Sequence, residues 1–245
     1  MSYLAWKIEK FLKEFQPEEK SISNIDFSPI LRDSYELCYP VGNASFGNPD
    51  DTIFVPPIVA GDENDLILGD KTVFVDISEN LNCCGLEKFI CGISKSGTPI
   101  FVCDNHNFVL EAWQLIKSSK PTLIHIDQHR DEAVCKCGKG GDIHDTRICD
   151  YIDYAIKNEW ISADFLSFTE SADLCKLNDI PTENKIVNVD VDIFVPDCTI
   201  LSVEEKVQII CESAKNASLI TIATSPGFID QELSVEITKL LWKYL

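Results

Sequence analysis

Residues 121–131 read PTLIHIDQHRD and join an apolar run to an abrupt group of charged side chains. The run TLIHI is continuous rather than alternating, which is typical of a strand buried on both faces of a sheet. From residue 99 onward, similar runs (IFVC, KIVNVDV and LITIAT) alternate with helix-like segments. Strands that alternate with helices predict a parallel sheet with crossover helices. We therefore expect an α/β fold, a three-layer α/β/α sandwich with a mainly parallel sheet.

The spacing of apolar residues also predicts the individual elements. We expect helices at 2–15, 106–118, 147–159, 203–216 and 230–244. We expect strands at 52–55, 72–76, 99–103, 121–127, 165–168, 185–191 and 218–223. The segment 16–70 is rich in Pro, Asn, Ser and Asp, which predicts irregular structure. No change in composition marks a linker, so residues 1–245 are expected to form a single domain, with its motifs in 99–228 and nothing diagnostic in 1–98.

The balance of charge limits the classes of partner. The chain has 40 Asp and Glu residues against 21 Lys and Arg residues, a formal net charge of −19. Phosphate binding needs a basic surface, so neither nucleic acid nor an anionic membrane is expected as a partner. Metal ions and substrates that carry Lys-like or Arg-like groups are favoured instead. An acidic surface that serves only solubility is the alternative explanation.

Targeting signals and cysteine usage indicate the compartment. The first fifteen residues, MSYLAWKIEKFLKEF, lack the uninterrupted apolar stretch of a signal peptide. No run approaches the roughly 18 apolar residues that a membrane span needs. The eleven cysteines are scattered and odd in number, which is typical of reduced thiols. We expect a cytoplasmic protein.

Three of the expected strands end in carboxylates or imidazoles. DNHN follows the strand 99–103, DQHRD follows 121–126, and DVD closes 185–191. In such folds the carboxyl ends of the strands form the ligand-binding edge of the sheet. Asp127 and Asp131 would lie roughly 13 Å apart in an extended chain, so they meet only if the chain curls after its strand. The residues expected to converge are His106, Asp127, His129, Asp131, Asp190 and Asp192.

Four carboxylates and two imidazoles predict a metal site. This set exceeds what one tetrahedral zinc needs and suits two divalent ions held about 3.5–4 Å apart. Oxygen ligands without thiolates favour manganese or magnesium, and the imidazoles favour manganese, so we expect two Mn²⁺ per chain. All four histidines lie within residues 106–144, and His125 is expected to support a ligand or pack rather than bind. Acidic residues that only form turns and caps are the alternative.

These motifs resemble those of the arginase (ureohydrolase) superfamily, in which a histidine, D-x-H-x-D and D-x-D follow three strands. The resemblance implies one manganese ion bound by His106, Asp127, Asp131 and Asp190. It implies a second bound by His129, Asp127, Asp190 and Asp192. It also implies two catalytic residues: Asp131, which passes a proton to the leaving amine, and His144, which exchanges protons with solvent. Zinc deacetylases of the same broad fold lack the third acidic residue of D-x-H-x-D, so Asp131 favours the binuclear branch.

Departures from the family pattern indicate the substrate. Ala133 stands where arginases that act on the free amino acid carry an asparagine for its amino-acid end, and their substrate-binding glutamate has no equivalent in LITIATSPGF, where Thr224 and Ser225 stand instead. The first motif is D-N-H rather than G-G-D-H, and the chain is shorter than a typical arginase. A closer resemblance is to the peptide arginases of ribosomal-peptide maturation (RiPP biosynthesis). It implies a hydrolase that converts arginine residues of a precursor peptide to ornithine and urea, with Asp104, Asp230 or Glu232 as candidate guanidinium partners.

Two other functions remain open at this stage. One is a metal-dependent amidohydrolase or deacetylase on the same scaffold, acting on acyl-lysine or a polyamine. The other is a non-catalytic, metal-stabilised module that binds basic peptides. The final helix QELSVEITKLLWKYL has an apolar stripe that serves either the core or an oligomer contact.

Overall fold

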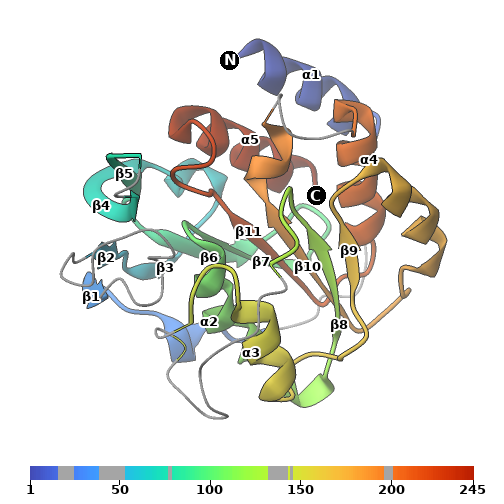
Figure 1. Cartoon of the computed structure of the whole chain (residues 1–245), viewed down its shortest axis with the longest axis horizontal. Helices are drawn as coiled ribbons and strands as arrows, with labels where there is room; N and C mark the ends of the chain where they lie inside the picture. The colour runs from blue at the N-terminus through green and yellow to red at the C-terminus, as the bar shows by residue number, and fades with distance from the viewer. Residues whose placement is uncertain (16–24, 39–52, 77–78, 132–142, 144–145, 196–200) are drawn as a thin grey trace.

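The computed structural model describes residues 1–15, 25–38, 53–76, 79–131, 143, 146–195 and 201–245 (Figure 1). In this part of the chain, the centre is a seven-stranded sheet in the order β3-β6-β7-β11-β10-β8-β9. Its strands are β3 (Ile58–Ala60), β6 (Phe89–Ile93), β7 (Pro99–Cys103), β8 (Thr122–Ile126), β9 (Leu166–Phe168), β10 (Lys185–Asp190) and β11 (Leu219–Ala223). From β7 to β9 all neighbours pair parallel, and only the β6–β7 pair is antiparallel. The expected mainly parallel sheet is confirmed.

The central strands are buried on both faces. Every residue of β7, β10 and β11 is buried, including the polar and charged ones. Each fully buried Val, Leu or Ile side chain contributes about 1.5–3 kcal/mol relative to an exposed one, so these strands anchor the fold. Burial on both faces of the sheet therefore explains why these strands are continuous apolar runs in the sequence.

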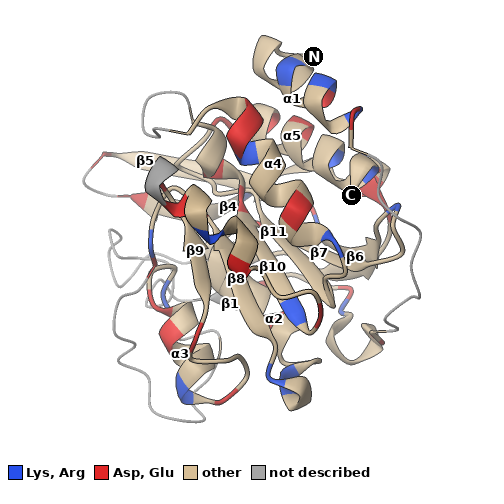
Figure 2. Ribbon diagram, turned by 90° about the vertical axis from the view of Figure 1, so that its right-hand side faces the viewer, with Lys and Arg blue, Asp and Glu red and all other residues tan. Residues whose placement is uncertain are grey.

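Helices cover both faces of the sheet. Figure 1 shows α1 (Tyr3–Leu12), α4 (Val203–Ala214) and α5 (Gln231–Tyr244) on one side, and α2 (Leu110–Trp113) and α3 (Tyr151–Lys157) on the other. Figure 2 shows the same separation from a second direction. The three-layer α/β/α arrangement is thus confirmed. None of the helices in the described residues is long and apolar enough to cross a membrane.

Local sequence signals set the starts of the two long C-terminal helices. Ser202 Oγ accepts a hydrogen bond from the Glu205 backbone N–H at 3.2 Å, and the Glu205 carboxylate accepts one from the Ser202 N–H at 2.7 Å. This reciprocal pair is a capping box, and it satisfies two backbone donors that the first turn leaves free. Asp230 caps α5 in a simpler way, because its carboxylate accepts from the Leu233 N–H at 2.9 Å.

The expectation of irregular structure over 16–70 is wrong for part of that segment. It contains β1 (Glu36–Cys38), β3 and the first residues of β4 (Leu68–Asp76), and β1 pairs with β2 (Ile53–Val55), where the strand 52–55 was expected. β1 and β3 have only three residues each and no distinctive apolar run, and they form because partner strands are supplied from elsewhere in the chain. β5 (Leu81–Leu86), which pairs with β4, and β6 were also missed, because LNCCGL and FICGI mix apolar residues with Cys and Gly.

The single helix expected over 106–118 is also wrong. The structure has a 3₁₀ turn over His106–Val109, the short α2, and a second 3₁₀ turn over Lys117–Ser119. The side chain of Asn107 donates to the Thr146 carbonyl at 3.0 Å, so polar groups of the first turn bind other loops and compete with helix formation. The other 3₁₀ helices span Ser28–Ile30, Glu63–Asp65, Ser171–Asp179 and Val191–Phe194.

We expect Gly92→Ala to lower the free energy of unfolding by about 1–3 kcal/mol. A Cβ atom at this position of β6 would overlap the Gly61 carbonyl and come within 2.6 Å of the Trp242 ring, and neither group can move freely. Chemical denaturation measures the effect. The exposed neighbour Lys95, changed to Ala, should stay within about 0.5 kcal/mol of the parent protein. Equal midpoints for the two variants would contradict the steric argument.

Candidate metal centre

The carboxyl ends of three parallel strands bring the expected ligands together. Asp190 is the last residue of β10, and Asp192 lies in the 3₁₀ helix that follows it. His106 opens the 3₁₀ turn after β7. Asp127, His129 and Asp131 follow β8. Because β8 and β10 pair in register, from Thr122 with Lys185 to Ile126 with Val189, their ends reach the same edge of the sheet.

The imidazole of His106 lies among three carboxylates. Its Nδ1 is 3.2 Å from Asp127 Oδ2 and 2.8 Å from Asp131 Oδ2. Its Nε2 contacts Asp190 Oδ2 and lies 3.0 Å from Ser225 Oγ. These residues come from four different strand ends, so the sheet as a whole sets their positions.

His129 occupies the more open side of the same cluster. Its Nδ1 is 3.0 Å from Asp192 Oδ2 and 3.5 Å from Asp127 Oδ1. The His129 side chain is 45% exposed, whereas the side chains of Asp127 and Asp192 are fully buried. Among the described residues of the cluster, His129 is therefore the one that reaches the surface most.

The chain curls after β8, as convergence of the D-x-H-x-D residues requires. Asp131 has a left-handed backbone with φ of 46°. Asp127 Oδ1 accepts a hydrogen bond from the His129 N–H at 2.6 Å, which tightens the first step of the curl. Asp192 Oδ1 accepts from the Gln128 N–H at 3.4 Å and ties the curl to the β10 end. Asp131 thereby comes back to His106 instead of continuing away from the sheet.

Four buried carboxylate oxygens of the cluster have no hydrogen-bond donor beside them other than imidazole nitrogens, in the part of the chain that the structure describes. They are Asp127 Oδ2, Asp131 Oδ2, Asp190 Oδ2 and Asp192 Oδ2. Buried carboxylates that face one another need a cation or donors to offset their charge. The cluster contains three groups of residues whose ligand atoms, within each group, all lie within 4.8 Å of one another. The groups are His106, Asp127 and Asp190; Asp127, His129 and Asp192; and His125, Asp127 and Asp131. The cluster can hold a metal ion.

The pKa values of the cluster also indicate that its negative charge needs to be offset. Burial and the carboxylates of Asp190 and Asp127 raise the pKa of Asp192 to about 8, and burial also raises the pKa of Asp190. Burial would raise the pKa of Asp127 too, but His106 holds it well below its usual range. Hydrogen bonds to two carboxylates raise the pKa of His129 to about 11. The pKa of His106 is raised well above normal by three carboxylates, against the effect of burial. Without a metal, protons on the imidazoles supply the compensating charge.

Several other expected residues are placed differently or not at all. His144, the expected proton shuttle, and Ala133 lie outside the described residues. Asp104 is fully buried, and its Oδ1 accepts from the Leu86 N–H at 2.8 Å and the Thr224 hydroxyl at 3.2 Å. Its carboxylate therefore holds β5 and the β11 loop rather than facing a substrate.

Two contributors were not assigned by the sequence. Ser225 brings its hydroxyl to His106, and its own φ of 53° turns the chain after β11; the following Pro226 and Gly227 were the only sequence signal of that turn. Tyr151 of α3 packs its ring edge against His106, with ring centroids 5.9 Å apart. No local pattern marks Tyr151, because its role depends on a helix packing over a distant strand end.

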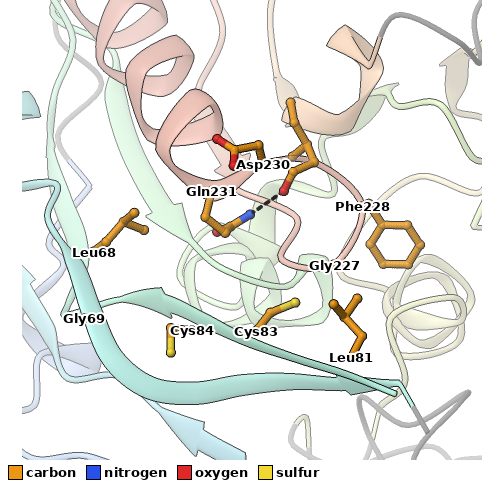
Figure 3. Close-up of a pocket in the computed structure, with 10 residues that line it drawn as sticks. Leu68, Gly69, Leu81, Cys83, Cys84, Gly227, Phe228, Asp230 and Gln231 are labelled. Carbon is orange, nitrogen blue, oxygen red and sulfur yellow. Dashed lines mark hydrogen bonds between the residues drawn. The ribbon is translucent and has the colours of Figure 1, made fainter. Parts of the chain in front are cut away.

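A pocket of about 490 Å³, whose lining residues are drawn in Figure 3, has Phe228 in its wall. It lies between the β4–β5 pair and the loop that leads into α5, and Leu81, Cys83 and Phe228 line its apolar part. The Phe228 ring is also in edge contact with the His129 ring, with centroids 5.4 Å apart. Phe228 therefore connects the pocket wall with the candidate metal centre. Asp230 lies on the same pocket, exposed at the start of α5.

No protein-family model, no curated protein and no solved structure matches this chain. The α/β fold and the buried His/Asp cluster are therefore the observations from which a function can be inferred.

We expect Mn²⁺ to stabilise the protein and Asp192→Asn to abolish most of that effect. At 100 times its dissociation constant, a ligand that binds only the folded state adds about 2.7 kcal/mol. In chelator the same variant should be at least as stable as the parent, because burial and the neighbouring carboxylates already favour the protonated form of Asp192, which an asparagine resembles. Thermal or chemical denaturation with and without Mn²⁺ measures both effects, and Asp164→Asn, at an exposed position, is the control. A variant that responds to Mn²⁺ like the parent would rule out this site.

The affinity for Mn²⁺ should increase with pH between about pH 6 and pH 8. His129, with a pKa of about 11, and Asp192, with a pKa of about 8, hold protons in the metal-free protein and must lose them to bind a cation. Protons therefore compete with the metal, and a falling pH favours the protons. Titration calorimetry in two buffers of different ionisation enthalpy gives both the affinity and the number of protons released. A pH-independent affinity without proton release would contradict this account.

Proposed function

We propose that the protein is a binuclear manganese hydrolase that converts arginine residues of a peptide to ornithine and releases urea. The observation that carries the proposal is the convergence of four buried carboxylate oxygens at one edge of the sheet, where imidazoles are the only hydrogen-bond donors beside them in the described residues. Asp127 belongs to every group of close ligand atoms, as a carboxylate shared between two ions would. The match of these residues to the motifs of the arginase superfamily supplies the choice of reaction.

The residues fit two divalent cations. One would be held by His106, Asp127, Asp131 and Asp190, and the other by His129, Asp127, Asp190 and Asp192. Oxygen-rich sites with some imidazole favour Mn²⁺ over Zn²⁺, and none of the six proposed ligands is a thiolate. When bound, the cations supply an activated water and offset the negative charge of the buried carboxylates.

The chain's own residues would position the substrate and move its proton. Hydrolysis forms a C–O bond and breaks a C–N bond of the guanidinium group, and the leaving side-chain nitrogen takes up a proton. Asp131 is suited to deliver that proton, because its Oδ2 is buried in the cluster and His106 Nδ1, at 2.8 Å, is its only polar partner in the described residues. The proposed role of His144 in exchanging protons with solvent completes this path.

The pocket beside His129 suits an arginine side chain within a peptide. Its apolar wall, with Phe228 nearest to the cluster, would pack against the methylene groups of the side chain. Asp230 offers an exposed carboxylate at the pocket, and the net charge of −19 favours a cationic substrate. Glu232, in the first turn of α5, is exposed and remains a second candidate partner. Asp104 is the least suited of the three expected guanidinium partners, since it is engaged inside the fold.

We place the reaction in the cytoplasm. Cys91, Cys103 and Cys211 carry free thiols and are buried, where they pack as small apolar side chains. Such a set of thiols is typical of a reducing compartment. A precursor peptide made by ribosomes would be present there.

Mass spectrometry of the reaction tests the proposal. We expect manganese-loaded protein to remove CN₂H₂ from arginine residues of peptides, to release an equal amount of urea, and to leave free arginine unchanged. Asp131→Asn should lower the rate by at least about 100-fold while Mn²⁺ still binds, because the leaving nitrogen loses its proton donor. Asp164→Asn should react like the parent.

Other results would indicate the alternative functions. One Zn²⁺ per chain together with release of an acyl group would establish a deacetylase. Tight binding of basic peptides with no change in their mass, at saturating Mn²⁺, would establish a binding module. Either outcome would overturn the arginase proposal.

A further inference from the structure

A row of polar side chains crosses the buried centre of the sheet. His125 of β8 pairs with Asn188 of β10, and Asn188 pairs with Thr221 of β11. All three residues are completely buried, in strands whose other residues are mostly apolar. Two buried aromatic residues from the helical layer, Tyr151 of α3 and Trp113 of α2, reach the same row. Five polar side chains in the core need a physical reason, because each costs free energy unless it is hydrogen-bonded.

The row is a continuous hydrogen-bond chain with a fixed direction. It begins at the indole N–H of Trp113, which can only donate, and which lies 3.3 Å from Thr221 Oγ1. The Thr221 hydroxyl then donates to Asn188 Oδ1 at 2.7 Å. The orientation of the Asn188 amide is thereby set, and its Nδ2 donates to the Tyr151 hydroxyl oxygen at 2.9 Å.

The hydrogen-bond chain ends at Nδ1 of His125. The Tyr151 hydroxyl lies 3.4 Å from His125 Nδ1, and Asn188 Nδ2 lies 3.5 Å from the same atom. Tyr151 already accepts from Asn188, so its own proton points to Nδ1. Two donors that meet at Nδ1 require this nitrogen to be the acceptor, so the ring carries its proton on Nε2.

The other nitrogen of His125 faces the curl that follows β8. Nε2 lies 3.2 Å from the backbone carbonyl of His129 and 3.5 Å from Asp127 Oδ2. With its proton on Nε2, His125 donates to the His129 carbonyl and holds the middle of the curl against the strand. The curl includes the left-handed residue Asp131, a conformation that persists only where its surroundings enforce it.

We propose that His125 is a positioning residue: the chain from Trp113 fixes its Nε2–H tautomer, and His125 thereby holds the curl that gathers Asp127, His129 and Asp131. The proposal rests on the metal site of the proposed function and not on its reaction. It also removes His125 from the possible ligands, because the nitrogen that faces Asp127 has no free lone pair. The group of His125, Asp127 and Asp131 is then not a separate metal site.

The tautomer is measured on the full-length, metal-free protein by NMR with ¹⁵N-labelled histidine rings. The signals of His125 are identified by their absence from the spectrum of His125→Gln. We expect Nδ1 in the chemical-shift range of an unprotonated ring nitrogen and Nε2 in that of a protonated one. A proton on Nδ1 would overturn the proposal. This readout needs neither metal binding nor catalysis, so it is independent of the proposed function.

The positioning role is measured by Mn²⁺ calorimetry on matched variants. His125→Leu should lower the affinity by about 10–100-fold, as the loss of a residue that orients metal ligands commonly does. His125→Gln, whose amide N–H can reach the His129 carbonyl, should recover most of it. Tyr151→Phe should give a smaller loss together with a second tautomer in the NMR spectrum. Tyr154→Phe removes a different hydroxyl from α3, at a residue that does not belong to the hydrogen-bond chain, and should change neither the affinity nor the tautomer.

The outcomes separate the two proposals. Circular dichroism and denaturation midpoints first establish that each variant is folded. Unchanged Mn²⁺ affinity in folded His125→Leu overturns the positioning role, whatever the enzyme does. Normal Mn²⁺ binding and the expected tautomer without any urea release would overturn the proposed reaction and leave the role of His125 intact.

Discussion

Mutual repulsion among buried carboxylates is the constraint around which this molecule is built. Asp127, Asp190 and Asp192 are fully buried and lie close enough together that Asp192 resists ionisation. The rest of the fold holds them there: strands buried on both faces fix their backbones, and loops from other strand ends bring His106 and Ser225 against them. A fold that needed only stability would not retain such a cluster, because apolar residues of similar volume would serve at least as well.

The polar row beneath the cluster shows how the interior reaches the edge of the sheet. His125, Asn188 and Thr221 are neighbours across three strands. A shift in the register of any one strand would therefore break the row and leave its polar side chains without hydrogen-bond partners. The row therefore selects one register among those that apolar packing alone would allow. It connects the position of helix-layer residues such as Trp113 to the shape of a loop at the metal centre.

The sequence predicted those parts of the structure that depend on neighbouring residues. Continuous apolar runs end in acidic residues, so β7, β8 and β10 and the residues at their ends could be located together. The strand β3 could not, since Pro56 and Pro57 interrupt the apolar run before it and its partner, β6, is distant in the chain. The hydroxyl of Ser225 and the ring of Tyr151 escaped prediction for the same reason: each acquires its role from a segment that tertiary packing brings near. The curl at Asp131 was required by distance, but the hydrogen bonds that hold it were not visible.

The backbone of Asp131 restricts which residues evolution or design could place there. Its φ of 46° is a conformation that aspartate and asparagine adopt with little strain, while most other side chains do so only at a cost. Glutamate would keep the charge but fit the backbone poorly and extend one methylene further toward His106. The residue at position 131 must therefore carry a negative charge and must also adopt a left-handed backbone. Among carboxylates only aspartate meets both limits, so the position tolerates fewer substitutions than its chemistry alone would suggest.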